Sequence, residues 1–307
     1  MQQSVTFMEV SPRDGLQNES TLVSTEDKLT LIHRALDAGC RRVEVTSFAH
    51  PRLVPQMADA EAVCRGLPQR GDVTYTGLIL NRRGYDRLLA TERLDEAGLV
   101  VPASETFAQR NQGMSVAECV EMARGVLADA ARRGLRAQAT IAVAFGCPFE
   151  GEVPLERVLE IARALSDQQP VELALADTVG VGVPGQVLET FQALRQTLGD
   201  AMPLRGHFHD TRNTGIANAY AALLAGVETL DASIGGVGGC PFAPNASGNI
   251  ASESLVYMLD RMGVETGVDL DALIESAAWL QTVLGKTLPS GVLRSGGFPA
   301  GKLEDQR

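Results

Sequence analysis

The sequence lacks clusters of basic residues and long apolar stretches. No run of lysine and arginine is long enough to follow a nucleic-acid backbone, and the formal net charge of the 307 residues is -11. Nucleic-acid binding proteins need clustered cations to neutralise phosphates. No stretch approaches the roughly 18 apolar residues that a membrane span requires. The sequence therefore gives no support to nucleic-acid or membrane partners, and it favours action on a small molecule.

Cysteine is also scarce and is not arranged in pairs. The five cysteines form no Cys-x-x-Cys motif; they are Cys40, Cys64, Cys119, Cys147 and Cys240. An odd number of dispersed cysteines in a chain of this size indicates reduced thiols. The N-terminus passes into the apolar run at residues 5–10 with no visible secretory signal or transit peptide. We therefore expect a cytoplasmic protein.

Eight short apolar or β-branched runs alternate with longer helical patterns. The runs are residues 5–10, 42–48, 73–80, 97–101, 138–145, 171–176, 204–209 and 230–234. This alternation is typical of repeated βα units that build a parallel sheet. Eight units predict a closed (β/α)8 TIM barrel, whose active site lies at the carboxyl ends of the strands.

Helical patterns with clear ends lie between these runs. Ser24 begins the first, with Glu26 and Asp27 in its first turn, and Gly39 ends it. Further helices are expected over residues 55–66, 115–133, 154–167, 184–198, 216–226 and 252–262. From about residue 264, another helical pattern over 270–284 predicts additional C-terminal helices that cap the barrel. Because single barrels commonly reach about 250 residues or more, residues 1–307 are expected to form one catalytic domain.

Two of the four histidines occupy one predicted strand, in the segment Gly206-His207-Phe208-His209. Side chains alternate along a strand, so His207 and His209 point to the same face and Phe208 points to the other. A lone histidine is more often a hydrogen-bonded core residue than a metal ligand. Two at this spacing, at the carboxyl end of a barrel strand, favour a metal site.

Other polar residues follow predicted strands and should converge on the same end of the barrel. Asp14 follows the first strand, Asp177 ends the sixth, and Asn249 follows the eighth. Asp14 could instead be a turn residue before Gly15, and Asn249 a helix cap. Two imidazoles, a carboxylate and an amide oxygen leave room for water or substrate oxygens on an octahedral ion, so Mg2+ or Mn2+ is favoured over zinc.

Three further residues are candidates for chemistry near this ion. Arg13 stays protonated and can stabilise a developing oxyanion, although a surface ion pair is the simpler alternative. Glu44 lies in the second strand, where a buried carboxylate needs a partner. Cys240 follows a run of glycines and could be carried by a mobile loop that brings in a proton donor, or it could be incidental.

Four segments together closely resemble the hydroxymethylglutaryl-CoA lyase family, and the resemblance runs over nearly the whole chain. They are Ser11-Pro12-Arg13-Asp14-Gly15-Leu16-Gln17-Asn18-Glu19, Val43-Glu44-Val45-Thr46-Ser47-Phe48, Gly206-His207-Phe208-His209-Asp210-Thr211 and Gly238-Gly239-Cys240-Pro241. The His-x-His-Asp and Arg-Asp-Gly motifs are shared with related Claisen-type synthases and aldolases. The Gly-Gly-Cys-Pro loop is characteristic of the lyases.

The resemblance implies divalent-metal-dependent cleavage of 3-hydroxy-3-methylglutaryl-CoA to acetyl-CoA and acetoacetate, by a homodimer. By motif, the metal ligands are Asp14, His207, His209 and Asn249. Arg13 would stabilise the enolate oxygen and Cys240 would deliver a proton, with Glu44 and Asp177 as a supporting acidic pair. The motif leaves open whether Asp14 or His207 takes the hydroxyl proton. Possible helpers for the CoA phosphates are Arg82, Arg83 and Arg110.

The sequence departs from the family pattern at Asn213, Ala176 and Pro102, which fall on loops expected near the acyl group. A related acyl-CoA such as citramalyl-CoA is therefore an alternative substrate. A Claisen-condensing synthase that joins acetyl-CoA to a 2-oxo acid is another, although the chain has no room for a regulatory C-terminal domain. A non-catalytic CoA-binding protein is disfavoured because Arg13, Asp14, His207, His209 and Cys240 are all present.

Overall fold

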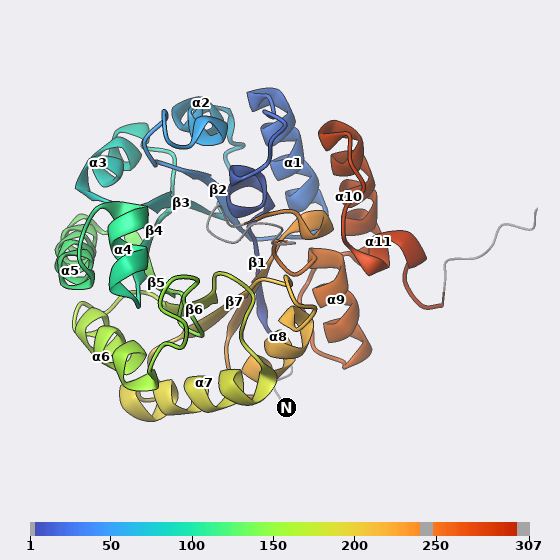
Figure 1. Cartoon of the computed structure of the whole chain (residues 1–307). Coiled ribbons are helices and arrows are strands. Elements are labelled where there is room, and N and C mark those ends of the chain that lie inside the picture. Colours follow the sequence, from blue (N-terminus) through green and yellow to red (C-terminus); the bar gives the residue numbers. More distant parts are fainter. Residues whose placement is uncertain (1–3, 240–247, 300–307) are drawn as a thin grey trace, which may run out of the picture.

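Eight parallel strands close into a barrel in the order β1 to β8, with β8 paired to β1. The computed structural model describes residues 4–239 and 248–299. Figure 1 shows the strands at the centre and the helices around them. The predicted (β/α)8 barrel with additional C-terminal helices is confirmed.

The strands lie where the apolar runs predict them, with shifts at their ends. They are β1 (Thr6–Glu9), β2 (Arg42–Ser47), β3 (Thr74–Ile79), β4 (Glu96–Pro102), β5 (Arg136–Ala142), β6 (Leu173–Asp177), β7 (Leu204–Phe208) and β8 (Thr229–Ala232). We expected the fifth strand to continue to residue 145. It ends earlier because Val143 has a φ of 52°, which takes the backbone out of the extended region.

Helices separate the strands and form the outer layer. They are α1 (Thr25–Asp37), α2 (Ala60–Gly66), α3 (Arg82–Thr91), α4 (Glu105–Gln112), α5 (Val116–Arg133), α6 (Leu155–Ser166), α7 (Pro184–Leu198), α8 (Gly215–Leu224), α9 (Ser252–Arg261), α10 (Leu270–Leu284) and α11 (Gly291–Ser295). Three short turns complete the order: η1 (Ser11–Gly15), η2 (Pro55–Met57) and η3 (Ile234–Gly236). At the start of α1, Ser24 Oγ accepts the Asp27 amide at 3.0 Å, which is the predicted cap.

The apolar pattern did not predict α3, α4 or α11. Helix α3 buries only Gly84, Tyr85 and Leu88, and its start is fixed by the Asn81 side chain, which accepts the Gly84 amide at 2.9 Å. Helix α4 buries only Phe107 and Ala108. Buried faces this short offer few apolar positions from which to recognise a helix, and such short helices depend on tertiary contacts.

The helices after residue 264 lie in the outer layer beside α1 and α9 (Figure 1). The Arg34 guanidinium of α1 sits 5.1 Å from the centre of the Trp279 ring of α10. Beyond α10, Lys286 Nζ lies 2.7 Å from Glu19 Oε1 in the segment after η1.

Among residues 4–239 and 248–299, no helix combines the length and apolar character that a membrane crossing requires.

Glu9, at the carboxyl end of β1, joins the loops at this end of the barrel. Its Oε1 accepts the amides of Ser11 at 2.8 Å and Ile234 at 3.1 Å, and its Oε2 accepts the Ser252 hydroxyl at 2.6 Å. The side chain is fully buried, and burial raises the pKa of Glu9 to about 7. One carboxyl group thus connects the starts of η1, η3 and α9.

The variant Glu9→Gln tests this connection. The amide oxygen can accept both backbone amides, and the amide nitrogen can donate to Ser252. Where folding raises the pKa of an acid, the folded protein loses stability as the pH rises from the unfolded to the folded pKa of that acid. We therefore expect the unfolding free energy of E9Q, relative to wild type, to increase by about 2 kcal/mol between about pH 5 and about pH 8. Urea unfolding at both pH values measures this, and a difference independent of pH would contradict it.

Candidate active site

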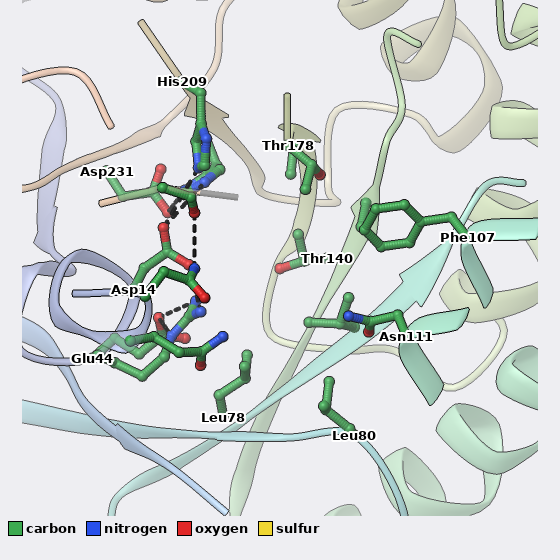
Figure 2. A pocket seen from close by; sticks show the side chains of 18 of the residues that line it. Asp14, Glu44, Leu78, Leu80, Phe107, Asn111, Thr140, Thr178, His209 and Asp231 are labelled. Carbon is green, nitrogen blue, oxygen red and sulfur yellow. Dashed lines mark hydrogen bonds and ion pairs between the residues drawn. The ribbon is translucent and has the colours of Figure 1, made fainter. Parts of the chain in front are cut away.

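A pocket opens at the carboxyl ends of the strands, where ligand sites of this fold lie. Figure 2 shows Asp14, Glu44, Asp231 and His209 on one side and Phe107 and Asn111 of α4 on the other. Thr140 and Thr178 lie between them, and Leu78 and Leu80 form an apolar wall. The pocket therefore has a charged side and a less polar side.

Asp14, His207 and His209 come together at the charged side. Their possible ligand atoms all lie within 4.8 Å of one another. The Nε2 atoms of His207 and His209 lie 3.9 Å and 3.5 Å from Asp14 Oδ2. The predicted alternation holds, because Phe208 points away and packs 6.1 Å from the Phe145 ring. A carboxylate and two imidazoles at these separations fit a divalent cation.

Asn249 lies against the same carboxylate. Its Nδ2 donates to Asp14 Oδ2 at 2.8 Å and to Val237 O at 3.2 Å, and the side chain is buried. Close packing of two glycines holds it there: Gly248 has a φ of 89°, and a Cβ on it would lie 2.7 Å from the Gly238 backbone. The glycine-rich segment is therefore closely packed at Gly238.

Arg13 bridges two acids at the edge of the pocket. Its Nη1 lies 2.5 Å from Asp14 Oδ1, and its Nε and Nη2 contact Glu44 Oε2. Glu44 points inward and lines the pocket, which settles the orientation that the strand pattern left open. Burial opposes the charge on Arg13, but the Glu44 and Asp14 carboxylates outweigh burial and raise its pKa. Arg13 is thus a permanent cation in the site.

The same contacts set the charge of Asp14. Burial by itself would raise the pKa of Asp14, but Arg13 and the two histidines outweigh burial and hold that pKa well below its ordinary value. Burial alone would lower the pKa of His207, whereas the Asp231 and Asp14 carboxylates raise it. Asp14 therefore presents an ionised carboxylate, the form that a cation requires.

Asp177 has a different set of contacts. Its Oδ1 and Oδ2 accept the amides of Val181 and Gly182, both at 2.9 Å. It is buried and is not among the residues that line the pocket. Asp177 thus holds the turn after β6, whereas Glu44 holds Arg13. The two acids that were predicted to act as a pair therefore have different partners.

Cys240 lies outside the described residues. The preceding Gly239 lines the pocket, and its carbonyl accepts from Asn18 Nδ2 at 2.8 Å. The other four cysteines are buried free thiols. Among them, Cys147 contacts the Ser104 hydroxyl at 2.9 Å.

The other positions singled out in the sequence have mixed outcomes. Ala176 lines the pocket, whereas Asn213 does not. Asn213 has a φ of 56°, in the left-handed region. Arg82 is the first residue of α3, pairs with Asp86, and does not line the pocket. Arg110 stacks over Phe149, 4.1 Å from the ring centre.

Sequence reasoning missed Asp231 and Arg205, which both line the pocket from the barrel interior. Arg205 precedes His207 by two residues and shares its face, and Asp231 is the β8 partner of His207 in the strand register. Asp231 was nevertheless recognisable as an acid within an apolar strand, where burial demands a partner.

This arrangement can be compared with known proteins. Residues 4–279 match the family model described as HMGL-like. The chain belongs to the HMGL-like family.

Relatives of this HMGL-like protein match over nearly their whole length. The chain is 41% identical over 286 residues to the hydroxymethylglutaryl-CoA lyase of Bacillus subtilis, covering 93% of this chain and 95% of that protein. It is 44% identical over 308 residues to the (R)-citramalyl-CoA lyase of Chloroflexus aurantiacus, covering 96% and 95%. The solved structure of an HMG-CoA lyase from Acinetobacter baumannii, in complex with coenzyme A and 3-methylmalate, has a TM-score of 0.92 and 36% identity, covering 96% of both chains. The resemblance read from the sequence is confirmed.

The histidine pair provides a direct test of the cation site. We expect His209→Ala to weaken Mn2+ binding by more than about tenfold, because one of the three convergent ligand atoms is lost. The matched control is His33→Ala on the exposed face of α1, which should bind Mn2+ like the wild type. Calorimetric titration of chelator-treated protein measures both, and equal affinities for H209A and H33A would contradict the site.

Proposed function

We propose that the protein is a carbon–carbon lyase that cleaves 3-hydroxy-3-methylglutaryl-CoA to acetyl-CoA and acetoacetate. The observation that carries this proposal is one pocket in which three side chains that could hold a cation lie beside a guanidinium group. The Bacillus subtilis relative, named as a lyase for this compound, supports the substrate. Cleavage requires the site to accept the hydroxyl proton and to return a proton to the carbon of the departing acetyl group.

The side chains that would hold the cation are Asp14, His207, His209 and Asn249. Their oxygen and imidazole donors suit Mg2+ or Mn2+. When bound, such an ion makes the substrate hydroxyl more acidic and supports the negative charge that develops as the carbon–carbon bond breaks.

The remaining roles fall to residues on that side of the pocket. The group that accepts the hydroxyl proton is Asp14 or His207, a choice that the motif leaves open. Arg13 stabilises the thioester enolate because it remains charged throughout, and Glu44 fixes its guanidinium. Cys240 returns the proton, a role that comes from its motif and is supported by the position of Gly239 at the pocket.

A second candidate substrate is citramalyl-CoA, which would give acetyl-CoA and pyruvate. The 44% identity to the (R)-citramalyl-CoA lyase favours it. This substrate lacks one methylene between the hydroxyl-bearing carbon and the carboxylate, so the same residues could perform the same steps. Leu78, Leu80 and Ala176 line the pocket and are our candidates for discriminating between the two acyl groups.

The wider organisation is also a proposal, and its homodimer comes from the family resemblance. We propose that residues 1–307 form one catalytic domain with a helical cap from about residue 264, and that two copies form a homodimer in the cytoplasm. The acyl-CoA substrate is consistent with the coenzyme A complex of the Acinetobacter baumannii relative.

A panel of acyl-CoA thioesters tests the proposed reaction. With Mg2+ or Mn2+, we expect acetyl-CoA release from 3-hydroxy-3-methylglutaryl-CoA, its loss on chelation, and its recovery when the ion is restored. Because one methylene is worth about tenfold or more in discrimination, kcat/KM for citramalyl-CoA should be lower by at least that factor. Turnover of citramalyl-CoA alone would establish the second candidate. A condensing synthase would instead release free CoA from acetyl-CoA only when a 2-oxo acid is present. It would cleave neither 3-hydroxy-3-methylglutaryl-CoA nor citramalyl-CoA.

A further inference from the structure

Asp231 lies in the barrel interior directly beside His207. The two residues are partners in the parallel register of β7 and β8, and the Asp231 side chain is only 1% exposed. Its Oδ2 lies 3.3 Å from His207 Nδ1. The family motifs in the sequence do not include this carboxylate.

The contact specifies which nitrogen of His207 carries the proton. A carboxylate oxygen can only accept, so Nδ1 of His207 has to donate. In the neutral ring, Nε2 is then unprotonated, and this atom is the one that faces Asp14 at 3.9 Å. An unprotonated nitrogen is what a metal ligand must present.

His209 differs from His207 in this respect. Its Nε2 also faces Asp14, at 3.5 Å. Within the described residues, however, its buried Nδ1 has no hydrogen-bond partner. Of the two histidines, His207 is therefore the one whose Nδ1 contacts a carboxylate.

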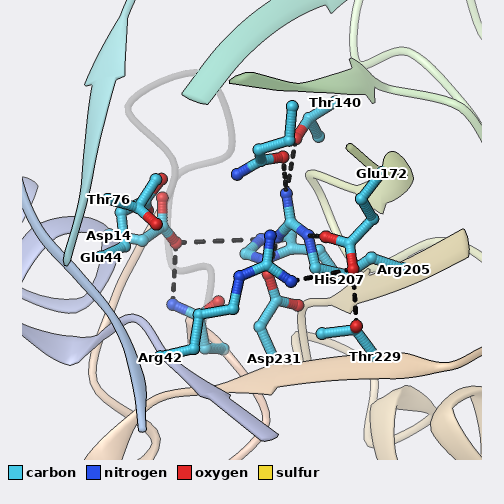
Figure 3. A network of polar contacts seen from close by, with 12 residues as sticks. Asp14, Arg42, Glu44, Thr76, Thr140, Glu172, Arg205, His207, Thr229 and Asp231 are labelled. Atoms are coloured by element: carbon cyan, nitrogen blue, oxygen red, sulfur yellow. Dashed lines mark hydrogen bonds and ion pairs between the residues drawn. The ribbon is translucent and has the colours of Figure 1, made fainter. Parts of the chain in front are cut away.

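Arg205 in turn fixes Asp231. Its Nη1 contacts Asp231 Oδ2, while its other donors reach Glu172 at 2.9 Å, Gln138 at 2.6 Å and Thr140 at 2.9 Å. Figure 3 shows Arg205 between Glu172 and Thr140, with Asp231 and His207 beside it. In the described part of the chain, Asp231 Oδ1 has no hydrogen-bond partner, so the two donors on Oδ2 alone orient the carboxylate.

We propose that Asp231 is a positioning residue that keeps the proton of His207 on Nδ1 and its Nε2 free toward Asp14. Asp231 acts through His207 and needs no contact with substrate. The consequence for cation binding stands on its own, whereas the consequence for turnover rests on the proposed function.

The test reads the ring of His207 directly. The chain has four histidines, so selective 15N labelling gives four imidazoles that histidine-to-alanine variants can assign. In chelator-treated wild type, at a pH high enough for the 15N shifts to show a neutral ring, we expect His207 to carry its proton on Nδ1. A wild-type His207 protonated on Nε2 would overturn the proposal without any variant of Asp231.

The variant Asp231→Ala should move the proton of His207 to Nε2 and weaken Mn2+ binding by about 10- to 100-fold. The resonances of His209 provide an internal reference, because Asp231 makes no contact with its Nδ1. If D231A keeps the wild-type tautomer and affinity, Asp231 does not position His207.

Glu172→Gln is the matched control, because Glu172 is also buried and shares Arg205 with Asp231 but does not contact His207. We expect E172Q to retain the Nδ1-protonated ring and Mn2+ affinity within about twofold of wild type, a margin well below the loss expected for D231A. The same tautomer change in E172Q would assign the effect to general loosening of the barrel interior and overturn the specific role. These readouts need no substrate, so they stay informative if the thioester panel shows no cleavage.

Discussion

A series of hydrogen-bonding and ionic contacts, in which donors and acceptors alternate, crosses the interior of the barrel. The site depends on this series of contacts. It runs from Arg205 through Asp231, His207, Asp14 and Arg13 to Glu44. A buried carboxylate without a donor would cost several kcal/mol. Each acid here has at least one cationic or imidazole partner, so these charged side chains can be buried together. Pairs of this kind add little net stability compared with apolar packing, and their main consequence is the fixed orientation of each group.

The barrel supplies these neighbours through strand register. Arg205 and His207 share one face of β7 because they are two residues apart, and β8 places Asp231 beside His207. Asp14 arrives from η1, which Glu9 anchors through the Ser11 amide. A closed parallel sheet thus brings together residues more than 200 positions apart. The same geometry leaves the carboxyl ends of the strands open to a ligand.

Much of this arrangement could be predicted from the sequence. Periodicity located all eight strands, and the spacing of His207 and His209 alone predicted that both imidazoles face one site. The position of Asp14 after the first strand predicted its convergence with them. These signals are local or follow from the barrel rule, so no knowledge of register is needed.

The rest required three-dimensional contacts. The partnership of Asp231 with His207 depends on the register between β7 and β8, which the sequence does not specify to the residue. Helix α4 buries too few side chains to give a pattern, yet it supplies Phe107 and Asn111 to the pocket. The partners of Glu44 and Asp177 also differ, because one faces Arg13 and the other faces the turn after its own strand.

The central claim is that Asp14, His207 and His209 hold a divalent cation at the charged side of this pocket. An anomalous-difference map from crystals grown with Mn2+ tests it most directly. The account predicts one strong peak within bonding distance of Asp14 and of Nε2 of both histidines. A map with no peak at these three side chains, or with Mn2+ bound only elsewhere, would contradict it.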